Sequence, residues 1–221
     1  MASRRPAAKV AARRPAVAAP TSGPLRSVRV RMLADAEHYT HLVTELVAKA
    51  EHSLWIATAN VKEMRVEAPV GTRARARGSY VSMLDTLAGL VRRGVELRFL
   101  HGAPPSRPFR AELARQSTLL RRKSDWMRMC PRVHLKLVAI DGRHLYLGSA
   151  NFTGAGLGAK GDGRRNFEMG IVTDDDVLLD GAQARFDAIW SGRECKGCRL
   201  RGVCPRPIDT LGGRGNNPDA K

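Results

Sequence analysis

Apolar and polar positions divide this chain into strands and helices that follow one another in turn. Two continuous apolar runs of strand length, 53–60 and 95–100, are typical of strands buried in the middle of a sheet. A shorter alternating stretch, 27–32, predicts a strand near the start, and the chain returns to strands after residue 123. The pattern thus predicts a sheet assembled from distant parts of the sequence.

Helices are predicted between these strands. The first starts at Asp35 as a candidate N-cap and has apolar residues at helical spacing, namely Tyr39, Leu42, Val43, Leu46, Val47 and Ala50. A second helix is expected over 80–91 and stops at Gly94, a third and basic one covers 108–123, and a last one covers 176–190. Strands alternating with helices favour an α/β fold, with a mixed β-sheet flanked by helices on both faces.

Composition separates the chain of 221 residues into three parts. Residues 27–191 form the predicted central domain, and residues 192–221 are a Cys-rich segment and tail. Residues 1–26 are rich in Ala, Arg and Pro and lack aromatic residues, so they are expected to be disordered. No apolar run approaches the roughly 18 residues of a membrane span. Without a secretion signal we expect a cytoplasmic protein, although an Arg-rich, acid-poor start is also typical of a transit peptide.

Charge indicates the kind of partner. The chain has 38 Lys and Arg against 21 Asp and Glu, a net charge of +17, and 30 of the cations are Arg, which favours bidentate contacts to phosphate. Residues 1–31 carry eight cations and no acid, so this tail is either a solvated polycation or a tether to nucleic acid or an anionic membrane. A basic loop at 71–78 is either a solvated face or a second phosphate contact.

The segment 133–153, VHLKLVAIDGRHLYLGSANFT, carries the candidate chemistry. His134 and Lys136 are two residues apart on a predicted strand, so both side chains emerge on one face. An imidazole beside an ammonium group forms a site for an anion. Asp141-Gly142 is typical of a hairpin turn, which would bring residues 148–151 back beside His134 and Lys136.

These residues resemble the signature of the phospholipase D superfamily, His-x-Lys-(x)4-Asp followed by Gly-Ser-x-Asn, and the similarity extends to Asn166-Phe167-Glu168. Six fixed residues at fixed spacing arise by chance roughly once in tens of millions of positions. The resemblance implies a site in which two motifs face each other. One histidine forms a phosphohistidine, and the other protonates the leaving oxygen and later activates water.

The resemblance also assigns roles to single residues. It implies that Glu168 hydrogen-bonds a histidine and fixes its tautomer, whereas without it Glu168 could be an exposed strand residue. Asp141 belongs to the motif without being the attacking group, or is simply a turn residue. The candidate phosphate-binding residues are Lys136, Ser149 and Asn151. The full set of candidate catalytic residues is His134, Lys136, Asp141, Ser149, Asn151 and Glu168.

The chain holds one copy of this motif. None of the other histidines has a Lys two residues further on: His38, His41, His52, His101 and His144. We therefore expect a homodimer with the active site on its twofold axis and an inactive monomer. The mechanism requires no metal or other cofactor for catalysis.

Four cysteines form a second candidate site: Cys130, Cys195, Cys198 and Cys204. Cys-x2-Cys spacing suits one metal centre, and four sulfurs can hold a structural zinc ion or a [4Fe–4S] cluster. The Cys-x2-Cys-x5-Cys pattern with one remote upstream cysteine is similar to the iron–sulfur clasp of RecB-family exonucleases. Disulfides or free thiols are the other readings, of which disulfides fit a chain without a secretion signal less well.

Three functions follow from the sequence. The first is a phosphodiesterase that cleaves DNA or RNA, which the positive charge favours. The second is a phospholipase D or phosphatidyltransferase acting on phospholipids, although no amphipathic, aromatic-bearing segment suited to a membrane is present. The third is a nucleic-acid-binding module without catalysis, which the intact motif disfavours.

Overall fold

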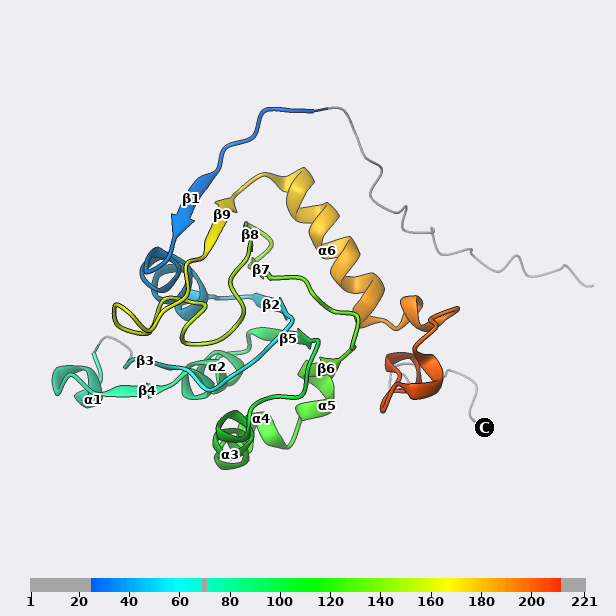
Figure 1. The fold of residues 1–221 in the computed structure, drawn as a ribbon. Coiled ribbons are helices and arrows are strands. Elements are labelled where there is room, and N and C mark those ends of the chain that lie inside the picture. The colour runs from blue at the N-terminus through cyan, green and yellow to red at the C-terminus, as the bar shows by residue number, and fades with distance from the viewer. Residues whose placement is uncertain (1–24, 69–70, 212–221) are drawn as a thin grey trace, which may run out of the picture.

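A mixed sheet of seven strands forms the centre of the molecule (Figure 1). The computed structural model describes residues 25–68 and 71–211, so most of the tail predicted to be disordered lies outside the described residues. In spatial order the strands are β1 (Arg31–Ala34), β9 (Met169–Thr173), β8 (His144–Gly148), β7 (Leu137–Ile140), β2 (Ser53–Thr58), β5 (Glu96–His101) and β6 (Met127–Met129). Neighbours from β1 to β2 are antiparallel, whereas β2, β5 and β6 run parallel.

Helices cover both faces of the sheet, as the sequence predicts. On one face Leu54, Ile56 and Phe99 pack in a core with residues of the helical elements before and after β5, which are η1 (π-helix, His38–Leu46), η2 (Val47–Lys49), α2 (Met83–Arg92), α3 (Arg107–Arg115), α4 (Ser117–Leu120) and α5 (Lys123–Trp126). On the other face Ala57 and Leu100 pack with α6 (Asp176–Trp190). Successive strand residues point to opposite faces, so β2, β5, β7 and β8 contribute to both cores.

Smaller elements lie outside the seven-stranded sheet and its main helices. A hairpin of β3 (Arg65–Glu67) and β4 (Tyr80–Ser82) includes a short helix, α1 (Arg73–Ala76), in the predicted basic loop. After α6 come three 3-10 turns, η3 (Arg193–Cys195), η4 (Arg201–Val203) and η5 (Ile208–Thr210). No described helix is both long enough and apolar enough to cross a bilayer.

Predicted and observed elements agree best where local signals are strong. The last helix covers 176–190 as predicted, and Asp175 caps it by accepting a hydrogen bond from the Leu178 amide at 2.9 Å. Gly94 follows α2 with a φ of 93°, which favours glycine at a helix end. The second helix begins at Met83 rather than residue 80, because Ser82 caps it and the three preceding residues pair with β3.

Two predictions near the start of the chain were wrong in detail. The strand expected over 27–32 begins at Arg31, because its partner β9 ends at Thr173 and offers no further ladder. Asp35 is not the N-cap of the first helix, since η1 begins at His38 after Glu37, without a side-chain cap. A third prediction, in the middle of the chain, also needs correction. The basic helix expected over 108–123 is interrupted at Gln116, whose backbone is not helical.

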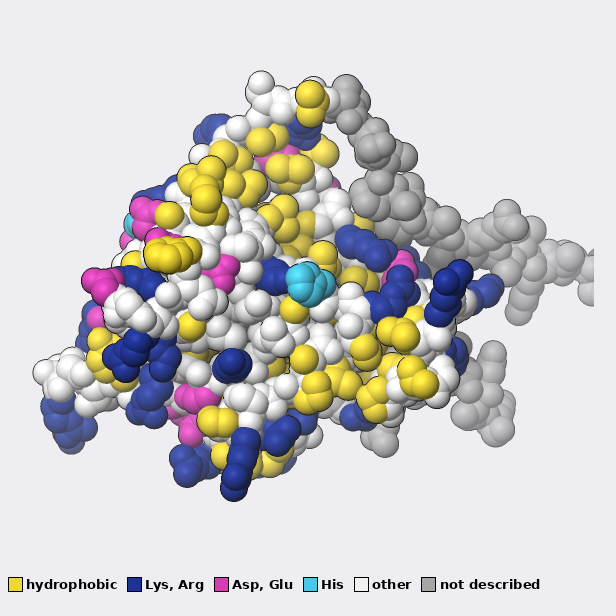
Figure 2. Space-filling view, viewed as in Figure 1, with side chains coloured by type: hydrophobic (Ala, Val, Ile, Leu, Met, Phe, Trp, Pro, Cys, Tyr) yellow, Lys and Arg dark blue, Asp and Glu magenta, His cyan; other side chains and the backbone are white. Residues whose placement is uncertain are grey.

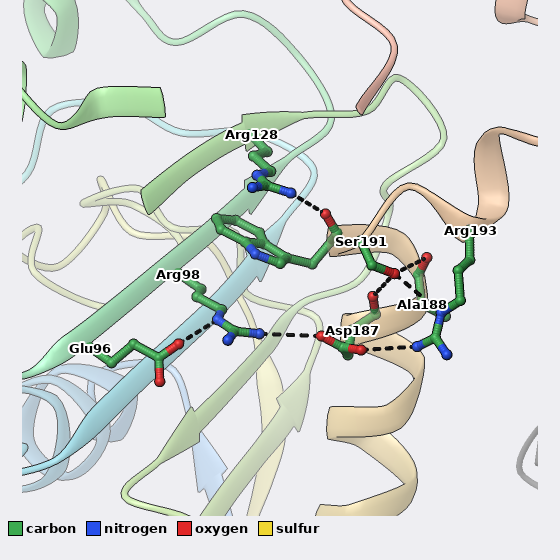
Figure 3. A network of polar contacts seen from close by, with 8 residues as sticks. Glu96, Arg98, Arg128, Asp187, Ala188, Ser191 and Arg193 are labelled. Carbon is green, nitrogen blue, oxygen red and sulfur yellow. Dashed lines mark hydrogen bonds and ion pairs between the residues drawn. The ribbon is translucent and has the colours of Figure 1, made fainter. Parts of the chain in front are cut away.

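A polar and aromatic network fixes the end of α6 against the sheet (Figure 3). Arg98 of β5 lies 4.3 Å from the centre of the Trp55 ring and pairs with Asp187 of α6 at 3.2 Å. Arg128 of β6 lies 4.3 Å from the Trp190 ring and donates a hydrogen bond to the Trp190 carbonyl oxygen. Cation–π contacts of this kind contribute about 0.5–2 kcal/mol each. The segment after α6 therefore starts beside the end of β6.

Candidate active site

His134 and Lys136 lie side by side on an extended segment that leads into β7. The Lys136 ammonium nitrogen is 3.1 Å from Nδ1 and 3.3 Å from Nε2 of His134, and it donates a hydrogen bond to the His134 carbonyl oxygen at 3.0 Å. His134 is exposed, while Val133 and Leu137 are buried and Leu135 is half-buried. The alternation predicted from the sequence thus presents the imidazole to solvent and holds the segment by its apolar side chains.

A tight hairpin brings the second half of the motif back to this segment. Asp141 and Gly142 both adopt left-handed backbone conformations, with φ of 57° and 62°, which reverse the chain between β7 and β8. The Gly148 amide then donates to the Lys136 carbonyl oxygen at 3.2 Å. A Cβ atom at position 148 would stand 2.2 Å from the Tyr146 hydroxyl oxygen, so only glycine fits there.

Ser149 and Glu168 form the polar base of the site. The Ser149 hydroxyl donates to the buried Glu168 carboxylate, which also accepts a hydrogen bond from the Asn166 side chain at 3.0 Å. The expected bond from Glu168 to a histidine is not made within the described part of the chain: its side-chain partners there are a serine and an asparagine. Glu168 therefore orients Ser149 in the single chain.

Asp35 fixes the backbone of Glu168 from the far end of the sequence. Its carboxylate accepts from the Glu168 amide at 2.9 Å, and its own amide donates to the Glu168 carbonyl oxygen at 3.0 Å. Asp35 has a φ of 44°, a conformation that Asp adopts more readily than most residues. A cap of the first helix is the role predicted for Asp35 from the sequence, because its true partner Glu168 lies 133 residues away.

Asn151 is oriented by residues at the end of β2. Its side-chain oxygen accepts from the Thr58 hydroxyl at 3.3 Å and from the Asn60 amide at 3.1 Å. With the oxygen engaged in this way, the NH2 group of Asn151 is the part available to donate to a ligand. Thr58 and Asn60 were not singled out from the sequence, although both are polar residues at the end of an apolar strand.

A cleft of about 880 Å³ opens beside Asn151 and Asn166. Lys62, Arg65 and Lys160 contribute cations to its lining. Within the described ranges, the side chains of Lys62 and Lys160 form no ion pair. Figure 2 shows further Lys and Arg side chains on this face of the molecule, over α1 and α3. The cleft is therefore suited to an anionic ligand.

Asp141 lies at the other end of β7 from Lys136 and does not join the site. Its carboxylate accepts hydrogen bonds from the backbone amides of Glu51, His52 and Ser53 at 3.0, 2.7 and 2.8 Å. These bonds tie the hairpin turn to the start of β2. Partial burial raises the pKa of the Asp141 carboxyl, but the three amides outweigh burial, so its pKa lies below the ordinary value.

The structure also gathers the four cysteines. Cys130, Cys195, Cys198 and Cys204 line one small cavity beside the segment that leads to His134, and none of them is in a disulfide.

Comparison with known proteins identifies the family. The model of the family described as "Cardiolipin synthase, PLD-like domain" matches residues 42–190, so the chain belongs to the phospholipase D-like domain family. The resemblance seen in the sequence is thereby confirmed. No curated protein matches the sequence.

Solved structures share the fold. Nuc from Salmonella typhimurium, a phospholipase D family member, is 17% identical with a TM-score of 0.50, over 75% of this chain and 95% of that one. A phosphatidylserine synthase from Haemophilus influenzae is 16% identical with a TM-score of 0.51, over 72% of this chain and 36% of that one. At these identities the similarity shows the fold, and it confirms the predicted α/β class.

We expect Asp141→Ala to destabilise the fold without removing a group from the cleft. Losing hydrogen bonds to a charged acceptor lowers the free energy of unfolding by about 1–3 kcal/mol. Because the folded-state pKa is depressed, this contribution is complete above the unfolded-state pKa of about 3.9 and is lost as pH falls through the folded-state pKa. Urea unfolding at neutral and acidic pH measures the difference. A difference between variant and parent that did not shrink as the pH falls below the unfolded-state pKa would contradict the assignment.

Proposed function

We propose that this chain is a phosphodiesterase that cleaves nucleic acid through a phosphohistidine intermediate. The observation that supports this most directly is the contact between the side chains of His134 and Lys136, in a chain whose Asn151 side chain is also held in one orientation. A phosphodiester is negatively charged and repels anionic nucleophiles, so a neutral imidazole flanked by an ammonium group and an amide suits the reaction.

In the first step, a ring nitrogen of His134 attacks phosphorus. A P–N bond forms while the P–O bond to the leaving group breaks, and an acid must supply a proton to the departing oxygen. Lys136 and the NH2 group of Asn151 neutralise the charge on the non-bridging oxygens. His134 cannot serve as the acid while its ring is the attacking group, so we assign that proton to His134 of the partner subunit.

In the second step, water replaces the histidine. The same imidazole of the partner subunit, now neutral, accepts a proton from water as the water oxygen attacks phosphorus and the P–N bond breaks. His134 is released, and the phosphate product leaves with the proton balance restored. Ser149 acts as a further phosphate ligand in this scheme when its hydroxyl turns from Glu168 to a phosphate oxygen, because a hydroxyl has one proton to donate.

A second copy of the chain is the proposed source of the other histidine. Three large apolar side chains are exposed along the β1–β9 edge, close to Glu168 in sequence and in pairing: Met32 (55%), Phe167 (95%) and Met169 (59%). Figure 2 shows hydrophobic side chains gathered over β1 and β9. An apolar edge beside half of an active site is what a twofold partner would cover.

Nucleic acid is the proposed substrate because the cleft is cationic. Lys62 and Lys160 line the cleft and are available to the phosphates of a bound strand, and duplex DNA carries one charge per about 1.7 Å of its length. A phospholipid presents a single headgroup phosphate to such a cleft and leaves the additional cations without partners.

We expect His134→Ala to abolish cleavage of DNA or RNA in EDTA while leaving binding within about twofold of the parent, because the attacking group is lost while the cations of the cleft remain. The matched control is His52→Ala. His52 is an exposed histidine directly before β2, whereas the contacts to Asn151 lie at the other end of that strand. Single- and double-stranded DNA, RNA and phosphatidylcholine vesicles are assayed in parallel. Choline release with intact nucleic acid would refute the substrate, and binding without cleavage by the parent would refute the enzyme.

Replacing Lys62 or Lys160 with Ala is expected to weaken nucleic-acid binding for every sequence tested. Each change should reduce the slope of log K against log salt by about 1, as the loss of one phosphate contact does. Lys49→Ala serves as the control, since this exposed lysine lies near the start of β2, away from the cleft. Fluorescence anisotropy across a salt series provides the measurement. Equal slopes for all three variants and the parent would exclude the cleft as the binding surface.

Phe167→Asp is expected to convert the dimer to a monomer and to remove cleavage, because it places a charge in the apolar edge. Val203→Asp is the control: Val203 is 79% exposed but lies in η4, away from β1 and β9. Sedimentation velocity gives the oligomeric state, and circular dichroism confirms that the variant is folded. An active monomer, in variant or parent, would contradict the shared site.

A further inference from the structure

Two separate parts of the chain meet at a small cavity lined by cysteines. Cys130 directly follows β6, and the other three cysteines lie in the turns after α6. The Arg98–Asp187 and Arg128–Trp190 contacts of Figure 3 hold the end of α6 against β5 and β6, which sets the two parts side by side. This arrangement belongs to neither the cleft nor the histidine motif.

The four cysteines line one cavity. The cavity has a volume of about 30 Å³, and apolar side chains such as Ile189, Leu200 and Ile208 complete its walls. Around one zinc ion, with Zn–S bonds of about 2.3 Å, four sulfurs would stand about 3.8 Å apart and leave no such space. Accordingly, within the described ranges no three His, Cys, Asp or Glu side chains meet as ligands for a single ion.

Backbone amides already face two of the sulfurs. Cys130 accepts a hydrogen bond from the amide of Arg132, and Cys198 accepts one from the amide of Leu200, in both cases two residues further along the chain. The Arg132 side chain also bonds Cys198. Four cysteine side chains that line one cavity can share a metal centre.

We propose that Cys130, Cys195, Cys198 and Cys204 bind a [4Fe–4S] cluster. Each thiolate ligates a different iron, so the sulfurs stand further apart than around a single ion, which matches a cavity between them. On binding, each thiol gives up its proton and the charge passes to the cluster. The cluster fastens the segment after α6 to the segment that leads from β6 to His134, where the Val133 amide donates to the Cys130 carbonyl oxygen at 2.9 Å.

The test is the metal content of the full chain, produced with added iron and purified without oxygen. We expect about four iron and four sulfide atoms per chain and the broad visible absorbance of an iron–sulfur cluster. Zinc in place of iron, or a chain free of metal with all thiols titratable, would overturn the proposal. These readouts do not depend on phosphodiesterase activity, so the two proposals fail separately.

The double variant Cys195→Ser and Cys198→Ser should lose the iron, whereas Val203→Ser, an exposed position between Cys198 and Cys204, should retain it. If the double variant does not fold, removing the iron oxidatively from the folded parent provides the second measurement. Limited proteolysis should then cut within residues 192–211 while the domain before them stays intact. Unchanged resistance after complete loss of iron would show that nothing is fastened there.

Discussion

The register of the β7–β8 hairpin is the constraint on which the site depends. The two left-handed residues at 141 and 142 set the turn, and pairing Leu137 with Leu147 then brings Gly148 beside Lys136. A shift by one residue would turn every side chain of β8 to the other face of the sheet. Tyr146 would then leave the core, together with the close packing that requires glycine at 148 and at 170. The spacing between the two halves of the motif is therefore set by the pairing of β7 with β8 as well as by the chemistry of the site.

The parts of the site that the sequence predicted are those fixed by neighbouring residues. The position of His134 beside Lys136 follows from the period of a strand, and the return of the chain to Gly148 follows from the hairpin signal. The length of α6 was predicted because apolar residues recur on one face of the helix. In each case the physical cause lies within about 15 residues of the feature it determines.

Contacts between distant segments could not be predicted in the same way. Asp35 is a residue type that often caps helices, yet its carboxylate accepts a hydrogen bond from the Glu168 amide. Only the pairing of β1 with β9 brings these two residues together. Thr58 and Asn60 orient Asn151 because β2 lies next to β7. Asp141 is the opposite case. It belongs to the motif in sequence, but its carboxylate accepts hydrogen bonds from the start of β2, 88 to 90 positions away.

The pairing of β1 with β9 sets an order of events during folding. Arg31 lies opposite Val172, so the first strand of the sheet has no partner until nearly the whole domain has been synthesised. Contacts of such long sequence separation form late, after the closure of the large loop between them. Asp35 follows this strand directly and docks with it, so Glu168 gains its backbone anchor at the end of folding. A nascent or partly folded chain can thus form the β7–β8 hairpin early and position His134 beside Lys136. The backbone of Glu168, which holds Ser149, is fixed only when the two ends of the domain meet.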